Sequence, residues 1–335
     1  SKPVCIDEIQ KAPQLLEALK LYVDRQRRNG DFLITGSANL LDMKRAKDTL
    51  AGRIVEITLH PFSLSEIQGG TSRNVVDELF RMPDDKNIGL HESGIHQERI
   101  VEDLLKGFYP ESIRLANALE RRLWFASYIS TYIERDARDM AELRDIDSFF
   151  RFVNVLAPRS TGLLNKSELS KEIGIRSETL ENYLTVMAQT FQITLLRPYY
   201  ENIGKQFVKS PKLYLNDTGL MCYFLRLYNR EQFEQSEYKG ALIETLVCNE
   251  LLKHIAFCQE STDLFFYRTN DKKEIDFILV RNDRIIAIEV KASASLDHDA
   301  FRHIRDFQRR SRKKVTGIVF YLGDRYLPFG DDCAA

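Results

Sequence analysis

Two short apolar runs near the start of the chain flank a stretch with helical spacing. Residues 4–6 are apolar and are followed by two acids, Asp7 and Glu8. Residues 32–34 are apolar and are followed by Thr35-Gly36-Ser37. Between these runs, apolar side chains recur every three or four residues, at Leu15, Leu16, Leu19 and Val23. Uninterrupted apolar runs are typical of buried parallel strands, and the period between them is that of a helix packed on one side. The pattern predicts a strand, a helix and a second strand.

Helical periodicity dominates the middle of the chain. From residue 98 to residue 156 apolar positions keep a helical period, as at Ile129, Tyr132 and Ile133. Residues 71–97, which precede this region, are polar and include glycine and proline. We expect them to form either a long surface connection or an insertion, without chemistry of its own.

Two short helices are expected next. Residues 165–168 have the pattern of a capping box, and the helix that they begin stops at Gly174. Ser177 is expected to cap a second helix, which runs to Thr190. Two short helices joined through a glycine turn are typical of a helix-turn-helix.

Two strands, predicted at residues 193–200 and 212–215, complete a winged-helix pattern. The second helix carries Glu178 and Glu181 and no Lys or Arg, whereas a helix that enters the major groove is bordered by cations that neutralise phosphates. An interdomain or partner-binding role is therefore favoured over base-specific DNA recognition. The wing could still touch a nucleic-acid backbone through its lysines, which are Lys205, Lys209 and Lys212.

A β-hairpin is expected near the C-terminus, where residues 274–280 and 285–291 flank a short polar turn. In its second strand, Glu289 and Lys291 lie two residues apart and so project from one face. Asp276 comes from the partner strand. Carboxylates on neighbouring strands offer the hard oxygen ligands that Mg²⁺ prefers.

The composition is that of a globular protein with several domains. The chain has 335 residues, of which 44% are hydrophobic and 29% charged, and its net charge is −1. Apolar runs such as residues 277–280 are far shorter than a membrane span, so no membrane segment is expected. Five cysteines form no CxxC pair and no cluster with histidine. These features lead us to expect a cytoplasmic protein with reduced thiols.

Four motifs near the N-terminus resemble, in the same order, those of a large prokaryotic family of predicted AAA+ ATPases. In that family they read DEIQK.P.LL, LTGS, LAGR and L.P.SF.E, and here they begin at Asp7, Ile34, Leu50 and Leu59. The resemblance implies that the protein binds ATP with Mg²⁺.

The same resemblance assigns roles to individual residues. Asp7 and Glu8 would form a Walker B pair, in which Asp7 holds the Mg²⁺ shell and Glu8 polarises the attacking water. Ser37 or Asn39 would lie near the γ-phosphate, and Arg53 of the LAGR motif is included in the nucleotide-binding set.

A phosphate-binding loop of the form GxxxxGK[ST] does not occur in the 335 residues. Because the family places this loop before the Walker B strand, we expect an upstream segment to carry it. We therefore expect the 335 residues alone not to bind ATP tightly. The alternative is a degenerate protein that does not hydrolyse ATP.

The C-terminal acids and lysine resemble the core of PD-(D/E)xK nucleases. This resemblance implies that Asp276 and Glu289 bind Mg²⁺, that Lys291 orients the nucleophilic water, and that Glu244 on the preceding helix completes the metal shell. The alternative is that Lys291 and Glu289 form only a salt bridge and that the fold is retained without activity.

A basic helix is predicted at residues 301–314. It carries seven cations against one acid, Asp306, and could bind the phosphates of a nucleic acid. The alternative is a solvated amphipathic helix. A homo-oligomer is also compatible with the sequence.

Together these patterns predict an α/β fold class with four parts. They are part of a P-loop AAA+ parallel sheet at residues 1–70, a connection and helical lid at 71–160, a winged helix at 161–217, and a restriction-endonuclease-like α/β domain at 218–325. We expect an AAA+ ATPase with a nuclease-like domain that acts on nucleic acid. The alternative is a non-catalytic, ATP-regulated binding or regulatory protein with a degenerate nuclease fold.

Overall fold

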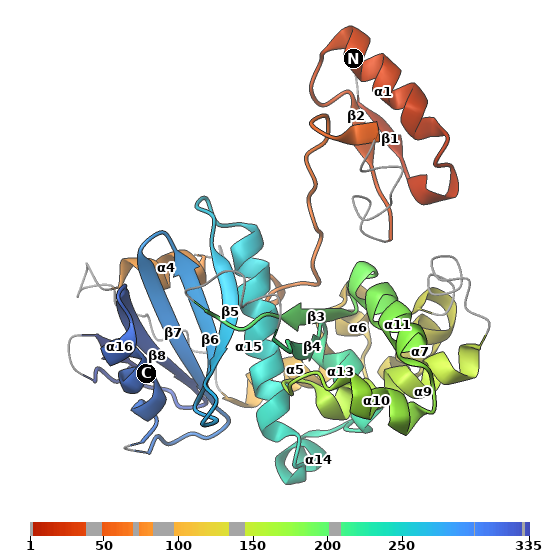
Figure 1. Ribbon diagram of the computed structural model, residues 1–335. Helices are drawn as coiled ribbons and strands as arrows, with labels where there is room; N and C mark the ends of the chain where they lie inside the picture. Colours follow the sequence, from red (N-terminus) through yellow and green to blue (C-terminus); the bar gives the residue numbers. More distant parts are fainter. Residues whose placement is uncertain are drawn as a thin grey trace.

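The protein has a mixed α/β fold, as expected. The computed structural model describes residues 3–37, 49–69, 74–82, 97–133, 145–200, 209–297, 299–329 and 332–335. A small N-terminal α/β unit stands apart from a larger body, which contains a helical part and a five-stranded sheet (Figure 1). Among the described residues, no helix is both long and apolar enough to cross a bilayer.

The N-terminal unit contains the predicted strand, helix and strand. Strands β1 (Val4–Ile6) and β2 (Phe32–Ile34) pair in parallel, and helix α1 (Leu15–Gln26) connects them. A single 3₁₀ turn, η1 (Ile9–Lys11), follows β1. The core of the unit is small and consists of buried Ile9, Leu16, Leu19 and Leu50.

An extended segment joins this unit to the body. Val55, Ile57 and Leu59 are exposed by 86, 82 and 92%, so the segment buries little surface of its own. The chain then enters the body at α3 (Leu64–Ile67), where the backbone N–H of Phe62 donates to the carbonyl of Phe108 at 2.9 Å. The two parts are therefore linked mainly through one stretch of chain (Figure 1).

The helical part packs its helices into one large core. The elements with the predicted helical period and their continuation are α5 (Gln97–Lys106), α6 (Pro110–Arg114), α7 (Ala118–Tyr128), the π-helical turn η3 (Ile129–Ile133), α9 (Ile146–Leu156), η4 (Ala157–Arg159), α13 (Thr218–Leu225) and α14 (Arg230–Gln235). Gly107 lets α5 and α13 approach closely. It has a φ of +75°, and a Cβ there would lie 2.5 Å from Oδ1 of Asp217.

The two short helices and two strands expected after the lid are present. They are α10 (Lys166–Ile173), α11 (Ser177–Gln189), β3 (Ile193–Leu196) and β4 (Lys212–Leu215), and the strands pair antiparallel. The expectation that Ser177 caps α11 is wrong. Arg176 occupies the N-cap position without a side-chain hydrogen bond, and Ser177 is the first helical residue.

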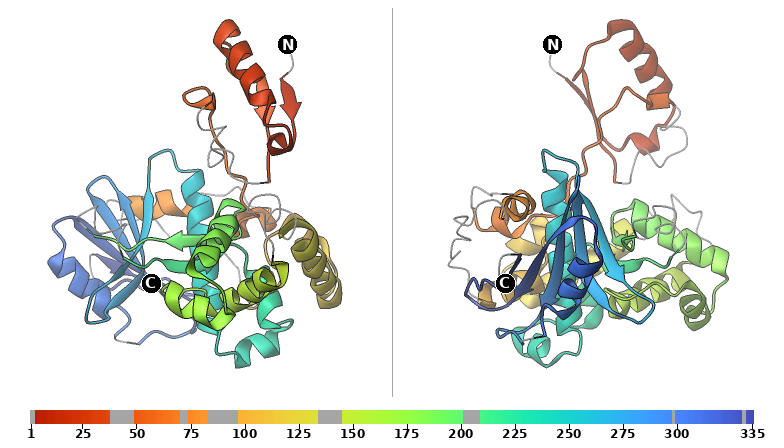
Figure 2. Two further views of the ribbon diagram at one scale, coloured as in Figure 1. Left: turned by 45° about the vertical axis from the view of Figure 1, so that its right-hand side comes forward. Right: turned by 60° about the vertical axis from the view of Figure 1, so that its left-hand side comes forward.

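The C-terminal sheet is flanked by helices on both faces. Helix α15 (Lys239–Ala256) leads into β5 (Asp263–Arg268), β6 (Glu274–Arg281), β7 (Arg284–Lys291), α16 (Arg302–Arg310), β8 (Lys314–Tyr321) and β9 (Cys333–Ala334). The strands lie in chain order; β5, β6 and β7 are antiparallel, and β7, β8 and β9 are parallel. Helix α15 packs on one face and α16 on the other (Figure 2).

The prediction of a connection across residues 71–97 is wrong for part of that range. Residues Val75–Arg81 form helix α4, which begins at the N-cap Asn74 and buries Val76, Leu79 and Phe80 against the C-terminal sheet. Residues 71–73 and 83–96 lie outside the described ones.

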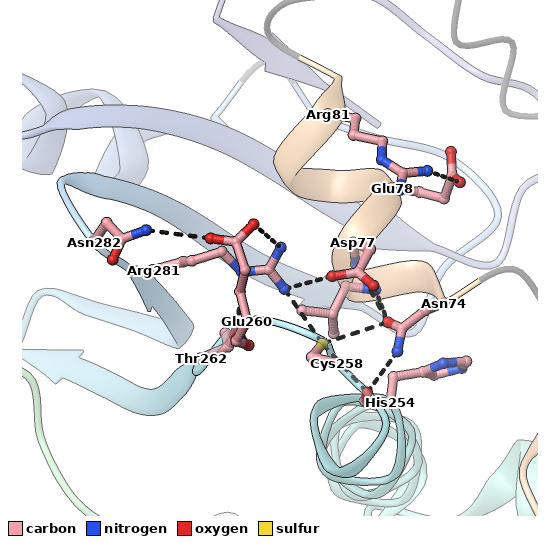
Figure 3. A network of polar contacts seen from close by, with 11 residues as sticks. Asn74, Asp77, Glu78, Arg81, His254, Cys258, Glu260, Thr262, Arg281 and Asn282 are labelled. Carbon is pink, nitrogen blue, oxygen red and sulfur yellow. Dashed lines mark hydrogen bonds and ion pairs between the residues drawn. The ribbon is translucent and has the colours of Figure 1, made fainter.

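Polar contacts tie α4 to the end of the β6–β7 hairpin (Figure 3). The guanidinium of Arg281 donates to Oδ1 of Asp77 at 2.7 Å and to the hydroxyl of Thr262 at 2.8 Å. Because Arg281 is buried, these partners replace its lost hydration. Helix α4 is therefore part of the C-terminal domain's packing although it precedes the helical part in sequence.

The predicted basic helix is shorter than expected. Helix α16 ends at Arg310, and Lys314 already begins β8. The apolar run that follows Lys314 pairs in parallel with β7 along its whole length, which requires extended backbone there. Strand pairing thus prevails over the helical preference of the basic residues.

Candidate functional site

The N-terminal acids lie at the tips of the two parallel strands, together with one of the predicted hydroxyls. Asp7 accepts a hydrogen bond from the hydroxyl of Thr35, which follows β2. The side-chain amide of Gln10 donates to the carboxylate of Glu8 and to Oγ of Ser37, the latter at 3.1 Å. Asp7, Glu8 and Ser37 are thus gathered at the carboxyl ends of the strands, where ligands bind in open α/β sheets.

Arg53, another predicted nucleotide-binding residue, is not placed with these acids. The guanidinium of Arg53 pairs with the carboxylate of Asp24, with Nε 2.6 Å from Oδ1. Asp24 lies near the end of α1, and this helix runs back from the strand tips to the start of β2. Arg53 therefore lies toward the opposite end of the unit from Asp7. Asn39 lies outside the described residues.

The C-terminal constellation comes together on adjacent strands. The β6–β7 register pairs Phe277 with Ile288, which places Asp276 across from Glu289. The carboxylate of Asp276 accepts the backbone N–H of Val290 at 2.8 Å through Oδ2. The ammonium of Lys291 lies 3.3 Å from Oε1 of Glu289. The predicted Asp276, Glu289 and Lys291 therefore form one cluster.

Lys212 enters the same cluster from β4. Its Nζ lies 2.9 Å from Oε1 of Glu244, 2.6 Å from Oε1 of Glu274 and 3.8 Å from Oδ1 of Asp276. Its side chain is only 2% exposed. Sequence reasoning placed this lysine in a wing that could touch a nucleic-acid backbone, and the structure buries it among carboxylates instead.

Two further side chains hold the acids around Lys212. The hydroxyl of Tyr214 donates to Oε1 of Glu244 at 2.7 Å, and the guanidinium of Arg268 lies 2.5 Å from Oε2 of Glu274. Lys212 and Tyr214 lie two residues apart in a strand and so share a face. A lysine and a tyrosine on one face of an otherwise apolar strand was the signal in the sequence that could have revealed this part of the site.

Burial changes the protonation of the cluster. Burial, and then the charge of Asp276, raises the pKa of Glu289 to about 8 and that of Glu244 to about 7. Burial also raises the pKa of Asp276. Burial lowers the pKa of Lys212, but the carboxylates of Glu244, Asp276 and Glu274 outweigh this effect and raise it above its ordinary value. Lys212 is therefore a permanent cation, whereas Glu289 is largely protonated at neutral pH.

One carboxylate oxygen in the cluster is left without a partner. Oε2 of Glu289 is buried and, among the described residues, has no hydrogen-bond donor. A buried carboxylate oxygen without a donor is costly when ionised, so it favours either a proton or a cation. Oε2 of Glu289 and Oδ1 of Asp276 are the hard oxygens that would suit Mg²⁺.

The third expected metal ligand is engaged elsewhere. Oε1 of Glu244 accepts hydrogen bonds from both Lys212 and Tyr214. Within the described ranges, no group of three or more His, Cys, Asp or Glu side chains is arranged to hold a metal ion. The residues thus fit a divalent ion held by Asp276 and Glu289 and completed by water, rather than a shell of three carboxylates.

Two hollows flank α16 beside this cluster. One, of about 370 Å³, is lined by Tyr199, Tyr200, Tyr267, Arg268, Thr269, Asn270, Phe307, Arg310 and Ser311. The other, of about 470 Å³, is lined by Asp271, Lys272, Lys273, Arg302, His303, Asp306 and Arg309. Burial, and then the charges of Arg302 and Lys291, lowers the pKa of His303 in the second hollow.

Three family models match successive parts of the chain. Residues 1–68 match an AAA domain, residues 97–231 match a domain of unknown function (DUF8612), and residues 239–335 match another domain of unknown function (DUF4143). The AAA match covers the N-terminal unit with its acids. The DUF4143 match covers most of the C-terminal cluster.

Several proteins resemble the chain over nearly all of its length. Uncharacterized protein Rv2008c of Mycobacterium tuberculosis is 27% identical over 338 residues, which covers 99% of this chain and 67% of that protein. An uncharacterized protein of Haemophilus influenzae is 25% identical over 96% of this chain and 76% of its own length. The solved structure of protein VC1899 from Vibrio cholerae aligns with 96% of this chain and 82% of its own at 14% identity, with a TM-score of 0.19, too low to define a common fold. The AAA and DUF4143 domains together fit a prokaryotic AAA-family ATPase-like protein.

Proposed function

We propose that the protein couples ATP binding in its AAA domain to hydrolysis of nucleic-acid phosphodiesters in its C-terminal domain. The observation that carries this proposal is the meeting of Asp276, Glu289 and Lys291 on two adjacent antiparallel strands. An acid on one strand and an acid and a lysine on the next is the arrangement that the nuclease resemblance implies.

The order of elements supports the same proposal. A helix, three antiparallel strands, a second helix and a strand parallel to the third follow one another as α15, β5, β6, β7, α16 and β8. This order brings the carboxylate of Glu244 on α15 next to the strands that carry the other acids. Fold alone does not establish activity, so the proposal depends on the side chains.

Each side chain has a role in the proposed hydrolysis. Asp276 and Glu289 would hold Mg²⁺, and a bound Mg²⁺ supplies positive charge to the phosphate oxygens. Glu289 would give up its proton when it holds this cation, since burial without a cation raises its pKa to about 8. Lys291 orients the attacking water. The water oxygen bonds to phosphorus, and the bond from phosphorus to the leaving oxygen breaks. The attacking water gives up one proton to solvent, and the leaving oxygen takes up one proton from solvent.

The hollows beside α16 offer a surface for the substrate. Their linings carry six cations, Arg268, Arg310, Lys272, Lys273, Arg302 and Arg309, against the two acids Asp271 and Asp306. Tyrosine rings in the first hollow can stack with bases that are not paired in a duplex. These features favour a nucleic-acid substrate whose phosphates follow α16.

At the other end of the chain, the proposed nucleotide site uses the strand tips of the AAA domain. Asp7 would hold the Mg²⁺ of the nucleotide, and Glu8 would polarise the attacking water. The hydrogen bonds from Thr35 to Asp7 and from Gln10 to Glu8 hold both carboxylates at the tips.

A protein that binds nucleic acid without cutting it is the second candidate. The observation that favours it is the engagement of Glu244 by Lys212 and Tyr214, which removes one carboxylate from the set that would bind metal. In this case the binding of ATP to the AAA domain would control whether the protein associates with a partner.

Cleavage of labelled single-stranded and duplex oligonucleotides with Mg²⁺, with and without ATP, tests the proposal. We expect Asp276→Asn and Lys291→Ala each to lower the cleavage rate by at least about 100-fold. Arg325→Ala is the control, because the Arg325 side chain is 80% exposed, and this variant should cleave at the wild-type rate. Cleavage that persists in both site variants would contradict the mechanism, and tight binding without cleavage by the wild type would favour the second candidate.

A further inference from the structure

We infer that Lys212 is a built-in cation of the carboxylate cluster and that it limits the site to a single divalent ion, held by Asp276 and Glu289. The inference rests on the proposed function for the identity of the metal site. It concerns a residue that lies outside the C-terminal domain in sequence, on β4.

The position of the Lys212 ammonium is the first reason. It lies within 4 Å of oxygens from three carboxylates, those of Glu244, Glu274 and Asp276. With 2% of its side chain exposed, it has exchanged water almost entirely for these oxygens. A buried ammonium is stable only when carboxylates compensate its desolvation, and the acids are equally dependent on it.

The backbone that carries Lys212 is fixed at both sides, which is the second reason. Lys212 pairs with Leu196 of β3 and bridges to Leu163. The continuation of β3 in turn pairs with β5, where the N–H of Tyr199 donates to the carbonyl of Phe266 at 2.6 Å. The backbone at Lys212 could move away only by breaking contacts in both sheets, which keeps the ammonium within reach of the carboxylates.

The charges around the site are the third reason. Four carboxylates, Glu244, Glu274, Asp276 and Glu289, face three cations, Lys212, Lys291 and Arg268. When all four acids are ionised, the cluster lacks one positive charge. A single divalent ion turns this deficit into an excess of one positive charge, whereas a second would raise the excess to three in a buried place. A second ion would also need Oε1 of Glu244, which Lys212 and Tyr214 already hold.

Counting bound Mn²⁺ tests this inference without any cleavage measurement. Electron paramagnetic resonance of free and bound Mn²⁺ at pH 8 gives the number of ions per chain, and Asp276→Asn/Glu289→Gln provides the background from other acids. Above this background we expect one ion in the wild type and two in Lys212→Met. In Lys212→Met/Glu244→Gln the count should return to one, because the second ion loses its ligand and the charge that attracts it.

Two results would overturn the inference. One is an unchanged count of one in Lys212→Met with native circular dichroism. The other is a wild-type protein that binds two Mn²⁺ ions, or none, above the background. This measurement tests the limit of one ion even if Lys212→Met does not fold. Because the count is read without substrate, loss of the proposed nuclease activity and loss of this inference are separate outcomes.

Discussion

The two acid clusters of this chain occupy similar positions at strand ends and differ in burial. In the N-terminal unit, Glu8 keeps 29% of its side chain exposed, and its neighbours are neutral hydroxyl and amide groups and the exposed Lys11. In the C-terminal domain, Glu289 keeps 10% and lies among other acids. Acids that water can reach need little compensation, whereas buried acids need a cation or a proton. This difference explains why, among the described residues, the second cluster contains a buried lysine and the first does not.

Removing that lysine should have the largest effect on stability. Lys212→Met leaves Glu244, Glu274 and Asp276 without their shared cation, and loss of one partner from a buried ion pair costs about 3–5 kcal/mol. Urea denaturation at pH 8 measures the change. The loss should shrink at pH 5, where the acids take up protons instead. An equal loss at both pH values would show that packing, rather than charge, explains the effect.

Packing around two glycines with left-handed backbone conformation also differs between the body and the N-terminal unit. Gly107, in the body, has a φ of +75°, and a Cβ there would clash with the buried carboxylate of Asp217. That carboxylate also accepts the backbone N–H of Phe108 at 2.7 Å. We expect Gly107→Ala to cost about 2–4 kcal/mol, from the backbone conformation and the disturbed hydrogen bonds.

Gly52 is the matched control in the N-terminal unit. Its φ is +71°, but a Cβ there would meet no atom within 4 Å. Gly52→Ala should therefore cost only the conformational part, about 1 kcal/mol. Thermal denaturation of both variants gives the comparison, and equal losses would mean that the close approach at Gly107 contributes nothing.

The pH dependence of stability should distinguish the buried acids. The pKa of Glu289 is raised from 4.5 to about 8 in the folded protein, so its contribution is complete below pH 4.5 and is lost as the pH rises through 8. Glu244, with a pKa of about 7, acts in the same direction at lower pH. Between pH 7 and 8 we expect the free energy of unfolding to fall by about 1 kcal/mol per pH unit.

Glu289→Gln checks this assignment. Glutamine cannot ionise, so in urea titrations of this variant the decline between pH 7 and 8 should fall to the smaller part that Glu244 contributes. Addition of Mg²⁺ to the wild type at pH 8 should also reduce the decline, because a cation replaces the proton. A decline of the wild-type size in Glu289→Gln would assign the titration to another group.

Local patterns predicted the parts of the two sites that lie on one stretch of chain. The apolar run that ends with acids at residues 4–8 predicts a strand with carboxylates at its tip. The two-residue spacing of Glu289 and Lys291 predicts that they share one face of a strand. The register of the β6–β7 hairpin then brings in Asp276. These features need no knowledge of how distant elements pack.

The rest of the candidate site depends on contacts between distant parts of the sequence. Lys212 reaches Glu274 because β3 continues alongside β5, and no local pattern encodes that pairing. Helix α4 was hidden in a polar stretch, although Asn74 and the spacing of Val76, Leu79 and Phe80 gave a short helical signal. Lys314 was assigned to a helix because its charge continues that of α16, whereas parallel pairing with β7 decides its conformation.

The smallest effect is expected at Arg53, whose pair with Asp24 provides the exposed counterpart of Lys212. The Arg53 side chain is 30% exposed and that of Asp24 45%, so water can solvate either charge when its partner is removed. Arg53→Met should leave the denaturation midpoint unchanged within error, at pH 5 and at pH 8, in the same urea titrations used for Lys212→Met. A clear loss at Arg53 would mean that this pair holds the small core of the N-terminal unit together, and burial would then no longer explain why Lys212 matters more to stability than Arg53.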